Sequence, residues 1–257
     1  MKVHKTALVH PDAIIGDNVE VGPFSIIGKD VKIGKGTVIE SNVLIDGDTE
    51  LGEDCHVYTG AVIGVPPQDL KYRGEKTKVV IGKNNVIREY VTINRGTAGV
   101  GETRLGDNNL LMAYAHVAHD CVIGSYVVLA NNATLAGHVI VEDRAVIGGM
   151  TPIHQFCRIG TYAILGGGSR TNKDVPPYCK AAGSPIRMYG LNSVALERNN
   201  FSLDVRNQLK KAYKIVFRSK LNTTQALAQL KKETNWCDEV KYFIQFIAES
   251  ERGITKE

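Results

Sequence analysis

Aromatic side chains are scarce in this sequence: phenylalanine, tyrosine and tryptophan make up 7% of the 257 residues, and tryptophan occurs once. A core with so few rings must be mainly aliphatic. Apolar runs of the roughly 20 residues that a membrane-spanning helix needs are absent as well. The segment from Met1 to His10 lacks the apolar stretch of a signal peptide. We therefore expect a cytoplasmic protein without a transmembrane segment.

Paired cysteines and a large excess of one charge are also lacking. The five cysteines are odd in number and form no CxxC pair, which argues against a disulfide framework and against a zinc ribbon. The 31 lysines and arginines nearly balance the 27 acidic residues, for a net charge of +4. Without basic segments interleaved with aromatic residues, this composition argues against binding to nucleic acid.

The dominant pattern in the sequence is a repeat of six residues. From Val9 to Leu165, every sixth residue is isoleucine, leucine or valine at 24 of 27 positions, and glycine often follows it. Helices have a period near 3.6 and ordinary strands a period of 2, whereas hexapeptide repeats of a parallel β-helix have a period of six. Each aliphatic side chain would point into a prism, and the glycine would supply a backbone conformation that other residues resist. We predict this solenoid for residues 1–188.

Two interruptions of the repeat, at residues 65–78 and 96–103, leave the six-residue register unchanged. Loops that replace whole omitted strands would produce this pattern, and such loops are common binding elements of solenoids. Three hexads make one triangular coil. Residues 18 apart should therefore lie one above the other, about 4.8 Å apart.

A second domain is predicted for residues 189–257, because the hexads end after Leu165 and the later apolar residues follow a helical spacing. A first helix would carry an apolar stripe from Val205 to Phe217. The expected boundaries are Ser202 as its N-cap, Thr223 or Thr224 as the N-cap of a second helix, Asp238 as the start of a third and Gly253 as its end.

The excess positive charge lies in this second domain, where residues 191–257 contain 12 basic and 8 acidic residues. Four cations recur every fourth residue and would form one cationic ridge on the first helix: Arg206, Lys210, Lys214 and Arg218. Like charges at this spacing repel each other by roughly 0.2–0.5 kcal/mol per pair, so an acidic partner would stabilise the ridge. A solvated cationic face is the alternative, and nucleic acid is a weaker one.

Four of the seven histidines lie in the second half of the repeat: His116, His119, His138 and His154. By the 18-residue rule, Gly137 lies above His119 and Gln155 lies above Gly137. In the same way Asp120 lies below His138. Three successive coils thus present imidazoles along one edge of the prism, beside a carboxylate that could fix a tautomer.

This cluster has the parts needed to move an acyl group. A histidine can act as general base toward a hydroxyl, Asp120 can orient it, and the N–H of Gly137 can stabilise the oxyanion at the acyl carbonyl. For any single histidine the alternative is a corner residue that only hydrogen-bonds a turn. Cys121 lies beside the cluster, but it is more simply a small core residue.

Five segments carry a resemblance that covers nearly the full chain: QDLKY (Gln68–Tyr72), AHVAHDC (Ala115–Cys121), NNATLAGH (Asn131–His138), IGGMTPIHQFC (Ile147–Cys157) and DVPPY (Asp174–Tyr178). They resemble the UDP-N-acetylglucosamine O-acyltransferase family, whose members catalyse the first step of lipid A synthesis. Together the segments are highly specific, whereas hexapeptide repeats alone would indicate only a broad set of acyltransferases and their relatives.

The resemblance implies a homotrimer of left-handed β-helices with active sites in the clefts between subunits. It implies transfer of a 3-hydroxyacyl chain from the phosphopantetheine of acyl carrier protein to the glucosamine 3-hydroxyl of UDP-N-acetylglucosamine. His119 would match the general base of the family, Asp120 its partner and Gly137 its oxyanion donor. No cofactor or metal is implied, and the cationic ridge would gain an acidic partner in acyl carrier protein.

Other positions match the substrate contacts of the family and its determinant of acyl-chain length. The matching substrate-binding residues are Gln68, Asp69, Lys71, His116, His138, His154, Gln155, Asn192 and Arg198. Gly167 matches the position that measures the acyl chain, and the lack of a side chain there would favour a longer chain. The sequence departs from the family where ALERNNF (Ala195–Phe201) replaces GLKRRGF, so Arg198 remains and Asn199 replaces the second arginine.

Three other functions remain open. An acyltransferase of the same fold could act on an amine, either in a 3-amino sugar nucleotide or in the later N-acylation step, although relatives of that step usually carry an extra N-terminal domain. A trimeric β-helical zinc enzyme of the carbonic anhydrase type could use His116, His119 and His138, but it would leave the QDLKY and HQF segments unexplained. The third is a non-catalytic binding or scaffold protein.

Overall fold

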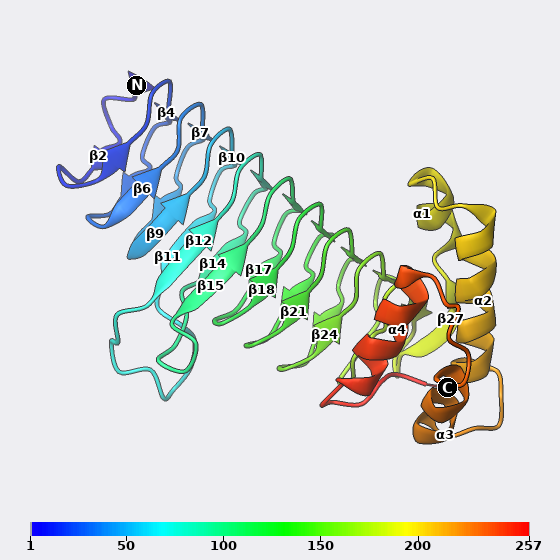
Figure 1. Ribbon diagram of the computed structural model, residues 1–257. Coiled ribbons are helices and arrows are strands. Elements are labelled where there is room, and N and C mark those ends of the chain that lie inside the picture. Colours follow the sequence, from blue (N-terminus) through cyan, green and yellow to red (C-terminus); the bar gives the residue numbers. More distant parts are fainter. Residues whose placement is uncertain (1, 257) are drawn as a thin grey trace.

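The computed structural model describes residues 2–256 and consists of a three-sided prism followed by a group of helices (Figure 1). Short strands succeed one another in three sheets, so that each turn of the chain adds one strand to each sheet. We name the sheets A, B and C in the order in which the chain enters them, and the corners AB, BC and CA after the sheets that they join. The predicted left-handed parallel β-helix with a C-terminal helical region is confirmed.

Within residues 2–256, each sheet stacks its strands in a fixed spatial order. Sheet A contains β1 (Lys2–Val3), β4 (Glu20–Val21), β7 (Val38–Ile39), β10 (His56–Val57), β13 (Val86–Ile87), β16 (Leu110–Leu111), β19 (Val128–Leu129), β22 (Val146–Ile147), β25 (Ile164–Leu165), β26 (Cys179–Ala182) and β27 (Arg187–Leu191). Sheet B contains β2 (Leu8–Val9), β5 (Ile26–Ile27), β8 (Leu44–Ile45), β11 (Val62–Val65), β14 (Thr92–Asn94), β17 (His116–Val117), β20 (Thr134–Leu135) and β23 (Pro152–Ile153). Sheet C contains β3 (Ile14–Ile15), β6 (Val31–Ile33), β9 (Asp48–Leu51), β12 (Lys78–Ile81), β15 (Glu102–Leu105), β18 (Val122–Ile123), β21 (Ile140–Val141) and β24 (Arg158–Ile159).

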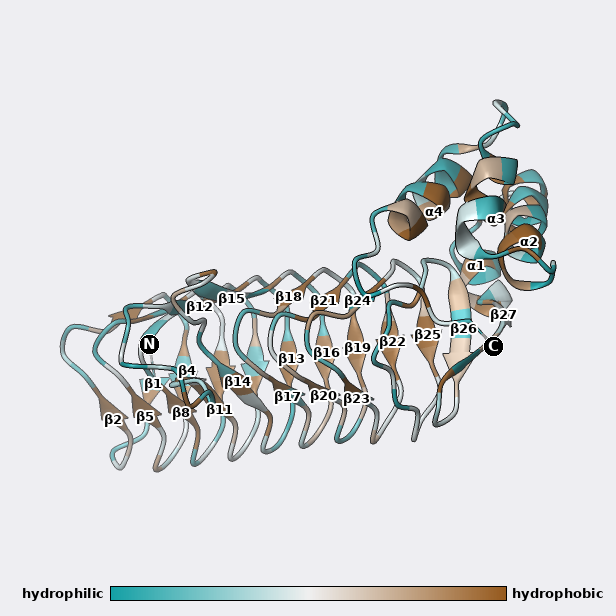
Figure 2. Ribbon diagram, turned by 90° about the horizontal axis from the view of Figure 1, so that it is seen from below, coloured by the Kyte–Doolittle hydropathy of each residue, from teal (hydrophilic) through white to brown (hydrophobic). Residues whose placement is uncertain are grey.

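Aliphatic side chains fill the prism. Beyond the first coil, where Val9 and Ile15 are partly buried, the aliphatic residues of the repeat point inward, and Ile45, Ile63 and Ile93 are 0% exposed. Burying one such side chain stabilises a fold by about 1.5–3 kcal/mol, so the repeat supplies its own core. In Figure 2 hydrophobic colour recurs from coil to coil along the prism, as on β2, β5 and β8.

The glycines that follow the aliphatic residues have a different purpose from the one predicted. A Cβ atom on Gly34 would lie 2.5 Å from the carbonyl carbon of Gly52, and one on Gly52 would lie 2.5 Å from that of Gly82. Positive φ angles occur instead three residues after the aliphatic residue, as in Asp120 (60°) and His138 (61°). The predicted reason was therefore wrong for most of these glycines, which are required because neighbouring coils approach too closely for a side chain.

Both interruptions of the repeat leave the prism at the BC corner. Ile63 pairs with Ile93, which is 30 residues further on, and Ile93 pairs with Val117, which is 24 residues further on. The excess over 18 residues is two hexads in the first loop and one in the second, which explains why the register survives. Figure 1 shows the two loops projecting on the same side, near β11 and β15.

The C-terminal region begins where β27 turns back antiparallel to β26. Within residues 2–256 it contains the helices α1 (Ser193–Arg198), α2 (Leu203–Phe217), α3 (Thr223–Leu230) and α4 (Asp238–Ala248). The side chain of Ser202 accepts from the N–H of Val205, so its predicted role as N-cap of α2 is confirmed. The expected domain division between residues 188 and 189 falls inside β27, and it stays a prediction.

Two predicted helix ends were wrong. Asn222, not a threonine, caps α3, because its side chain and that of Gln225 bond each other's backbone N–H groups in a capping box. The helix α4 starts at Asp238 as predicted, but it ends at Ala248, well before Gly253. The short helix α1 was not anticipated. Between residues 2 and 256, no helix combines the length and the apolar character that crossing a membrane requires.

Candidate active site

The BC corner brings the histidine cluster together from three successive coils. The N–H of His138 donates to the carbonyl of His119 (3.0 Å), and the N–H of Phe156 donates to the carbonyl of Gly137 (3.2 Å). The ring of Phe156 stacks on that of His138 with centroids 4.5 Å apart. His119, Gly137 and Gln155 therefore form one column, with Asp120, His138 and Phe156 in the column beside it.

Asp120 lies at the centre of this cluster, and its side chain is fully buried. Its carboxylate accepts from the N–H (2.8 Å) and the hydroxyl (2.6 Å) of Thr97. The Oδ2 atom also lies 2.8 Å from Nδ1 of His119 and 3.5 Å from Nε2 of His138. Because a carboxylate only accepts, Nδ1 of His119 carries the proton and Nε2 keeps its lone pair. This is the form that a general base requires.

The surroundings lower the pKa of two neighbouring rings. Burial is the main cause that lowers the pKa of His138; Asp120 opposes that shift, His119 adds to it, and Asp69 also opposes it. Burial likewise lowers the pKa of His116, and His119 lowers it further. Nδ1 of His116 lies 2.6 Å from the hydroxyl of Thr92, which fixes the ring on the outer face of β17.

Gly137 packs directly against the ring of His119. A Cβ atom at this position would lie 2.4 Å from Cε1 and 2.7 Å from Nε2 of His119, so only glycine leaves room for the ring. The N–H groups of Ala136 and His138 donate to carbonyls of adjacent coils, whereas no hydrogen bond within residues 2–256 uses the N–H of Gly137. This donor is therefore available beside the general base.

The first loop adds the QDLKY residues to the same corner. Gln68 and Lys71 are exposed, and the side chain of Asp69 accepts from the N–H of Lys71 (2.9 Å). Asp69 contributes to the electrostatic environment of His138, which places the loop beside the cluster. One coil beyond Gly137 and His138, His154 and Gln155 are exposed at the same corner.

Three other predicted site residues lie on different corners of the same chain. Asn192 sits at the CA corner, where its side chain donates to the carbonyl of Tyr162 (2.9 Å) and caps α1. Arg198 is exposed at the end of α1. Gly167 lies at the AB corner, where a Cβ atom would meet the carbonyl oxygen of Gly149 at 3.3 Å. One copy of the chain does not bring these residues to His119.

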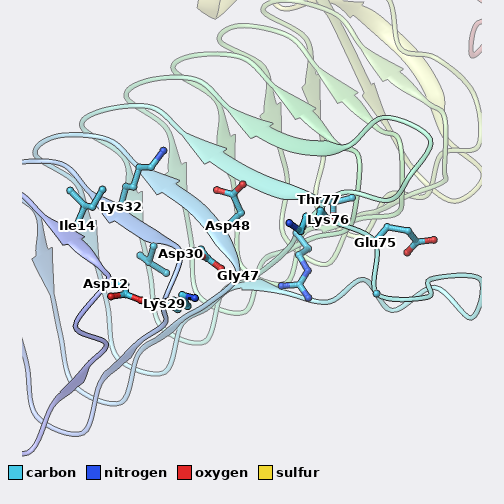
Figure 3. Close-up of a pocket in the computed structure, with 13 residues that line it drawn as sticks. Asp12, Ile14, Lys29, Asp30, Lys32, Gly47, Asp48, Glu75, Lys76 and Thr77 are labelled. Carbon is cyan, nitrogen blue, oxygen red and sulfur yellow. Dashed lines mark ion pairs between the residues drawn. The ribbon is translucent and has the colours of Figure 1, made fainter.

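A separate hollow of about 480 Å³ lies at the BC corner nearer the N-terminus (Figure 3). Its charged lining residues are Asp12, Asp30, Asp48, Glu75, Lys29, Lys32, Lys76 and Arg95. Opposite charges offset each other there, as in the 3.9 Å ion pair of Lys29 with Asp12. None of the lining residues is a histidine or a cysteine, so we place the candidate site at the cluster around His119.

Known proteins resemble this chain over nearly its whole length. A hexapeptide-repeat profile of bacterial transferases matches residues 30–64 and 102–137, and a profile described as domain 2 of UDP N-acetylglucosamine O-acyltransferase matches residues 174–255. Proteins named acyl-(acyl-carrier-protein)–UDP-N-acetylglucosamine O-acyltransferase from Thermodesulfovibrio yellowstonii and Myxococcus xanthus are 52% and 49% identical to it over 256 residues, which is 99% of each chain. The crystal structure of LpxA from Bacteroides fragilis matches with a TM-score of 0.95 at 44% identity, covering 98% of both chains. The chain belongs to the UDP-N-acetylglucosamine O-acyltransferase family. It is an acyltransferase.

The segment that departs from the usual pattern of this O-acyltransferase family has a cation beside it. Asn199 stands where the second arginine is usual, and its side-chain oxygen accepts from Nη1 of Arg144 at 3.3 Å. The guanidinium of Arg144 also lies over the ring of Tyr126, 4.4 Å from its centroid. Positive charge is thus present near position 199 although the residue itself is an amide.

Two residues of this candidate site were not singled out from the sequence. Thr97 belongs to the second loop. This loop leaves the prism at the BC corner, one coil before Asp120, which lies at the same corner. Phe156 stacks on His138, and the 18-residue rule that pairs His119 with Gly137 also pairs these two positions. The loop position and the 18-residue spacing could have identified both residues. Threonine and phenylalanine were passed over because they are less typical of catalytic sites than histidine.

The four residues of the predicted cationic ridge lie on α2 and its C-cap position, and the two arginines have partners of their own. Arg206 forms an ion pair with Glu197, and Arg218 donates to the carbonyl of Met188 (3.1 Å). Lys210 and Lys214 are exposed. Arg218 is exposed as well, and docking of an acidic partner on these four residues stays a prediction.

Proposed function

We propose that the protein transfers a 3-hydroxyacyl chain from acyl carrier protein to the glucosamine 3-hydroxyl of UDP-N-acetylglucosamine, the first step of lipid A synthesis. The observation that carries the proposal is the 2.8 Å contact between Nδ1 of His119 and Asp120, which leaves Nε2 as the proton acceptor. The names of its relatives supply both substrates. No cofactor is needed, because the carrier presents its acyl group as a phosphopantetheine thioester.

In the proposed reaction the sugar hydroxyl attacks the thioester carbonyl while Nε2 of His119 removes its proton. The carbonyl oxygen becomes an oxyanion, and the N–H of Gly137 stabilises it. The tetrahedral intermediate then collapses, the carbon–sulfur bond breaks, and the leaving thiolate takes the proton from His119. Asp120 stays ionised throughout and stabilises the imidazolium that forms transiently.

The same proposal requires more than one copy of the chain, and we propose the homotrimer that the family resemblance implies. The residues matched to substrate contacts occupy the BC corner (Asp69, His138, His154) and the CA corner (Asn192, Arg198), and the chain-length position Gly167 occupies the AB corner. A rigid prism cannot fold its own corners together, so a second copy must supply the missing parts to each site. A cytoplasmic location stays a prediction.

The hydrogen bonding around Asp120 favours this reaction over a zinc enzyme. Single ligand atoms of His119, Asp120 and His138 lie within 4.8 Å of one another and could in principle surround a metal. Two ligands of tetrahedral zinc at 2.0–2.1 Å are about 3.3 Å apart, whereas Nδ1 of His119 and Oδ2 of Asp120 are 2.8 Å apart, a hydrogen-bond distance. His116, the third predicted zinc ligand, does not belong to this group.

The test is transfer from 3-hydroxyacyl carrier proteins of several chain lengths to UDP-N-acetylglucosamine and, in parallel, to its 3-amino analogue. We expect ester formation by the wild type and a loss of about 10²–10⁴-fold in His119→Ala, with an unchanged melting temperature. His10→Ala, at an exposed histidine of the first coils, is the control. Formation of the amide alone would show that the acceptor is the 3-amino sugar nucleotide. Turnover that survives in His119→Ala would contradict the proposed role of His119 as general base.

A further inference from the structure

The segment after α4 returns to the BC corner and is fixed there to Asp174. The hydroxyl of Ser250 donates to Oδ2 of Asp174 (2.6 Å). The N–H of Asp174 donates to the carbonyl of Gly253 (3.0 Å), and the N–H of Thr255 donates to the carbonyl of Asp174 (2.9 Å). These contacts make the segment part of the prism wall.

Arg252 lies inside this anchored segment and reaches the candidate site. Its Nη2 atom is 3.2 Å from Nδ1 of His154 and 3.2 Å from the carbonyl oxygen of Asn172. The side chain of Arg252 is half-buried, whereas His154 is exposed at the corner. The C-terminal segment therefore contacts a residue matched to substrate binding.

The guanidinium decides which nitrogen of His154 carries the proton. Arginine only donates, so Nδ1 must offer its lone pair to Arg252, and the proton of the neutral ring is on Nε2. The carbonyl of Gln155, also 3.2 Å from Nδ1, would favour the opposite tautomer. A hydrogen bond from a charged donor is roughly twice as strong as one between neutral groups, so the contact with Arg252 prevails.

We infer that Arg252 is a positioning residue of the acceptor site, which holds His154 as an Nε2–H donor toward the bound sugar nucleotide. His154 lies two coils from His119, roughly 10 Å along the prism. It cannot reach the reacting hydroxyl, but it can reach an acceptor oxygen in a more distant part of an extended sugar nucleotide. The inference rests on the proposed function, which identifies that ligand.

The experiment compares KM and kcat of Arg252→Ala with those of the wild type. We expect KM for UDP-N-acetylglucosamine to rise about fivefold to tenfold, which is the effect of one lost hydrogen bond, while kcat stays within about twofold. Arg252→Lys keeps a charged donor and should recover most of the loss. The matched control is Ser250→Ala, which removes an anchor of the same segment without touching His154, and its KM should not change.

Coupling to His154 separates positioning from mere stability. In a His154→Ala background, Arg252→Ala should raise KM no further, because the group that it orients is absent. An unchanged KM in Arg252→Ala, an equal rise in Ser250→Ala, or additive effects with His154→Ala would overturn the inference. Calorimetric titration of UDP-N-acetylglucosamine gives the same comparison without turnover. If the wild type binds the nucleotide but transfers nothing, the proposed function fails. The inference about Arg252 is then still decided by the nucleotide affinities of the variants.

Discussion

Asp120 determines the chemistry of its neighbours because it is buried and surrounded by donors. Two hydrogen bonds from Thr97 fix the carboxylate, and the carboxylate in turn fixes the Nδ1–H tautomer of His119. Orientation of this kind removes a rotational search before proton transfer, which is how a positioned base contributes to rate. His119 and the N–H of Gly137 come from adjacent coils, so the inter-coil spacing sets the distance between the proposed base and the proposed oxyanion donor.

Gly137→Ala should therefore inactivate the enzyme without removing any catalytic group. The added Cβ would lie 2.4 Å from Cε1 of His119, so the ring must leave its position beside Asp120. We expect kcat/KM to fall at least about 100-fold, as for loss of the base itself, with an intact fold by circular dichroism. Gly99→Ala is the control, because its Cβ would meet only the hydroxyl of Thr97 at 3.8 Å. Near-normal turnover in Gly137→Ala would show that His119 does not act from the observed position.

His116 should make stability depend on pH. Its pKa in the folded protein lies below the ordinary 6.5 because of burial and of His119. The unfolded chain therefore binds this proton more readily, so the contribution is present above pH 6.5 and is lost as the pH falls below it. We expect the urea midpoint of His116→Gln to decline less than that of the wild type between about pH 7.5 and about pH 5.5. Equal declines would contradict this, and His10→Gln serves as the exposed control.

The helix α2 combines an apolar face with three exposed lysines, of which Lys211 pairs with Glu233. Leu209, Val216 and Phe217 are buried against the rest of the helical region, which orients the opposite face outward. Arg206 pairs with Glu197 and Arg218 bonds the carbonyl of Met188, so the predicted docking surface is best tested at Lys210 and Lys214. Both lysines are held on the same helix.

Reversing both lysines, as Lys210→Glu with Lys214→Glu, should raise the apparent KM for acyl carrier protein and reduce its salt dependence. Charge complementarity acts mainly on encounter, so kcat at saturating carrier should change little. The matched control is Lys231→Glu with Lys232→Glu, which makes the same charge change at the end of α3. Identical kinetics in the α2 variant and the wild type would show that Lys210 and Lys214 do not dock acyl carrier protein and contact only solvent.

The prism as a body separates the parts of the proposed site. Its strands are hydrogen-bonded continuously from β2 to β23 along one face, so the corners cannot move toward one another. Catalytic groups at one corner and nucleotide-contacting groups at another can meet only across an interface between copies. The site is then a property of the assembly, and its formation depends on protein concentration.

Mixed oligomers test this arrangement directly. His119→Ala disables the BC corner and Arg198→Glu the CA corner, so each pure variant should have little activity. If each site takes one corner from each of two copies, refolding an equal mixture should restore activity in about one quarter of the sites. The control mixes each variant with itself. No recovery from mixed trimers of confirmed composition would place both corners in the site of a single chain.

Much of this could be predicted because a hexapeptide repeat is local. The spacing of Val117, Leu135 and Ile153 determined which side chains form the core, and arithmetic on multiples of 18 placed Gly137 above His119. Local signals also predicted Ser202 as the N-cap of α2 and Asp238 as the first residue of α4. Asn222 was missed because a capping box depends on a reciprocal bond with Gln225, and the role of the glycines was mistaken because it depends on the backbone of the next coil.

The sequence by itself determined the fold, the family and the column of residues that carries the proposed chemistry, since each depends on a short, repeated pattern of side chains. Only the tertiary structure decided how Thr97 holds Asp120, which corner each predicted residue occupies, and that Arg252 contacts His154 from 98 residues away. The reason is physical: period and composition specify which face of the chain is buried, whereas a hydrogen bond between distant segments depends on where loops and the chain end return to the prism.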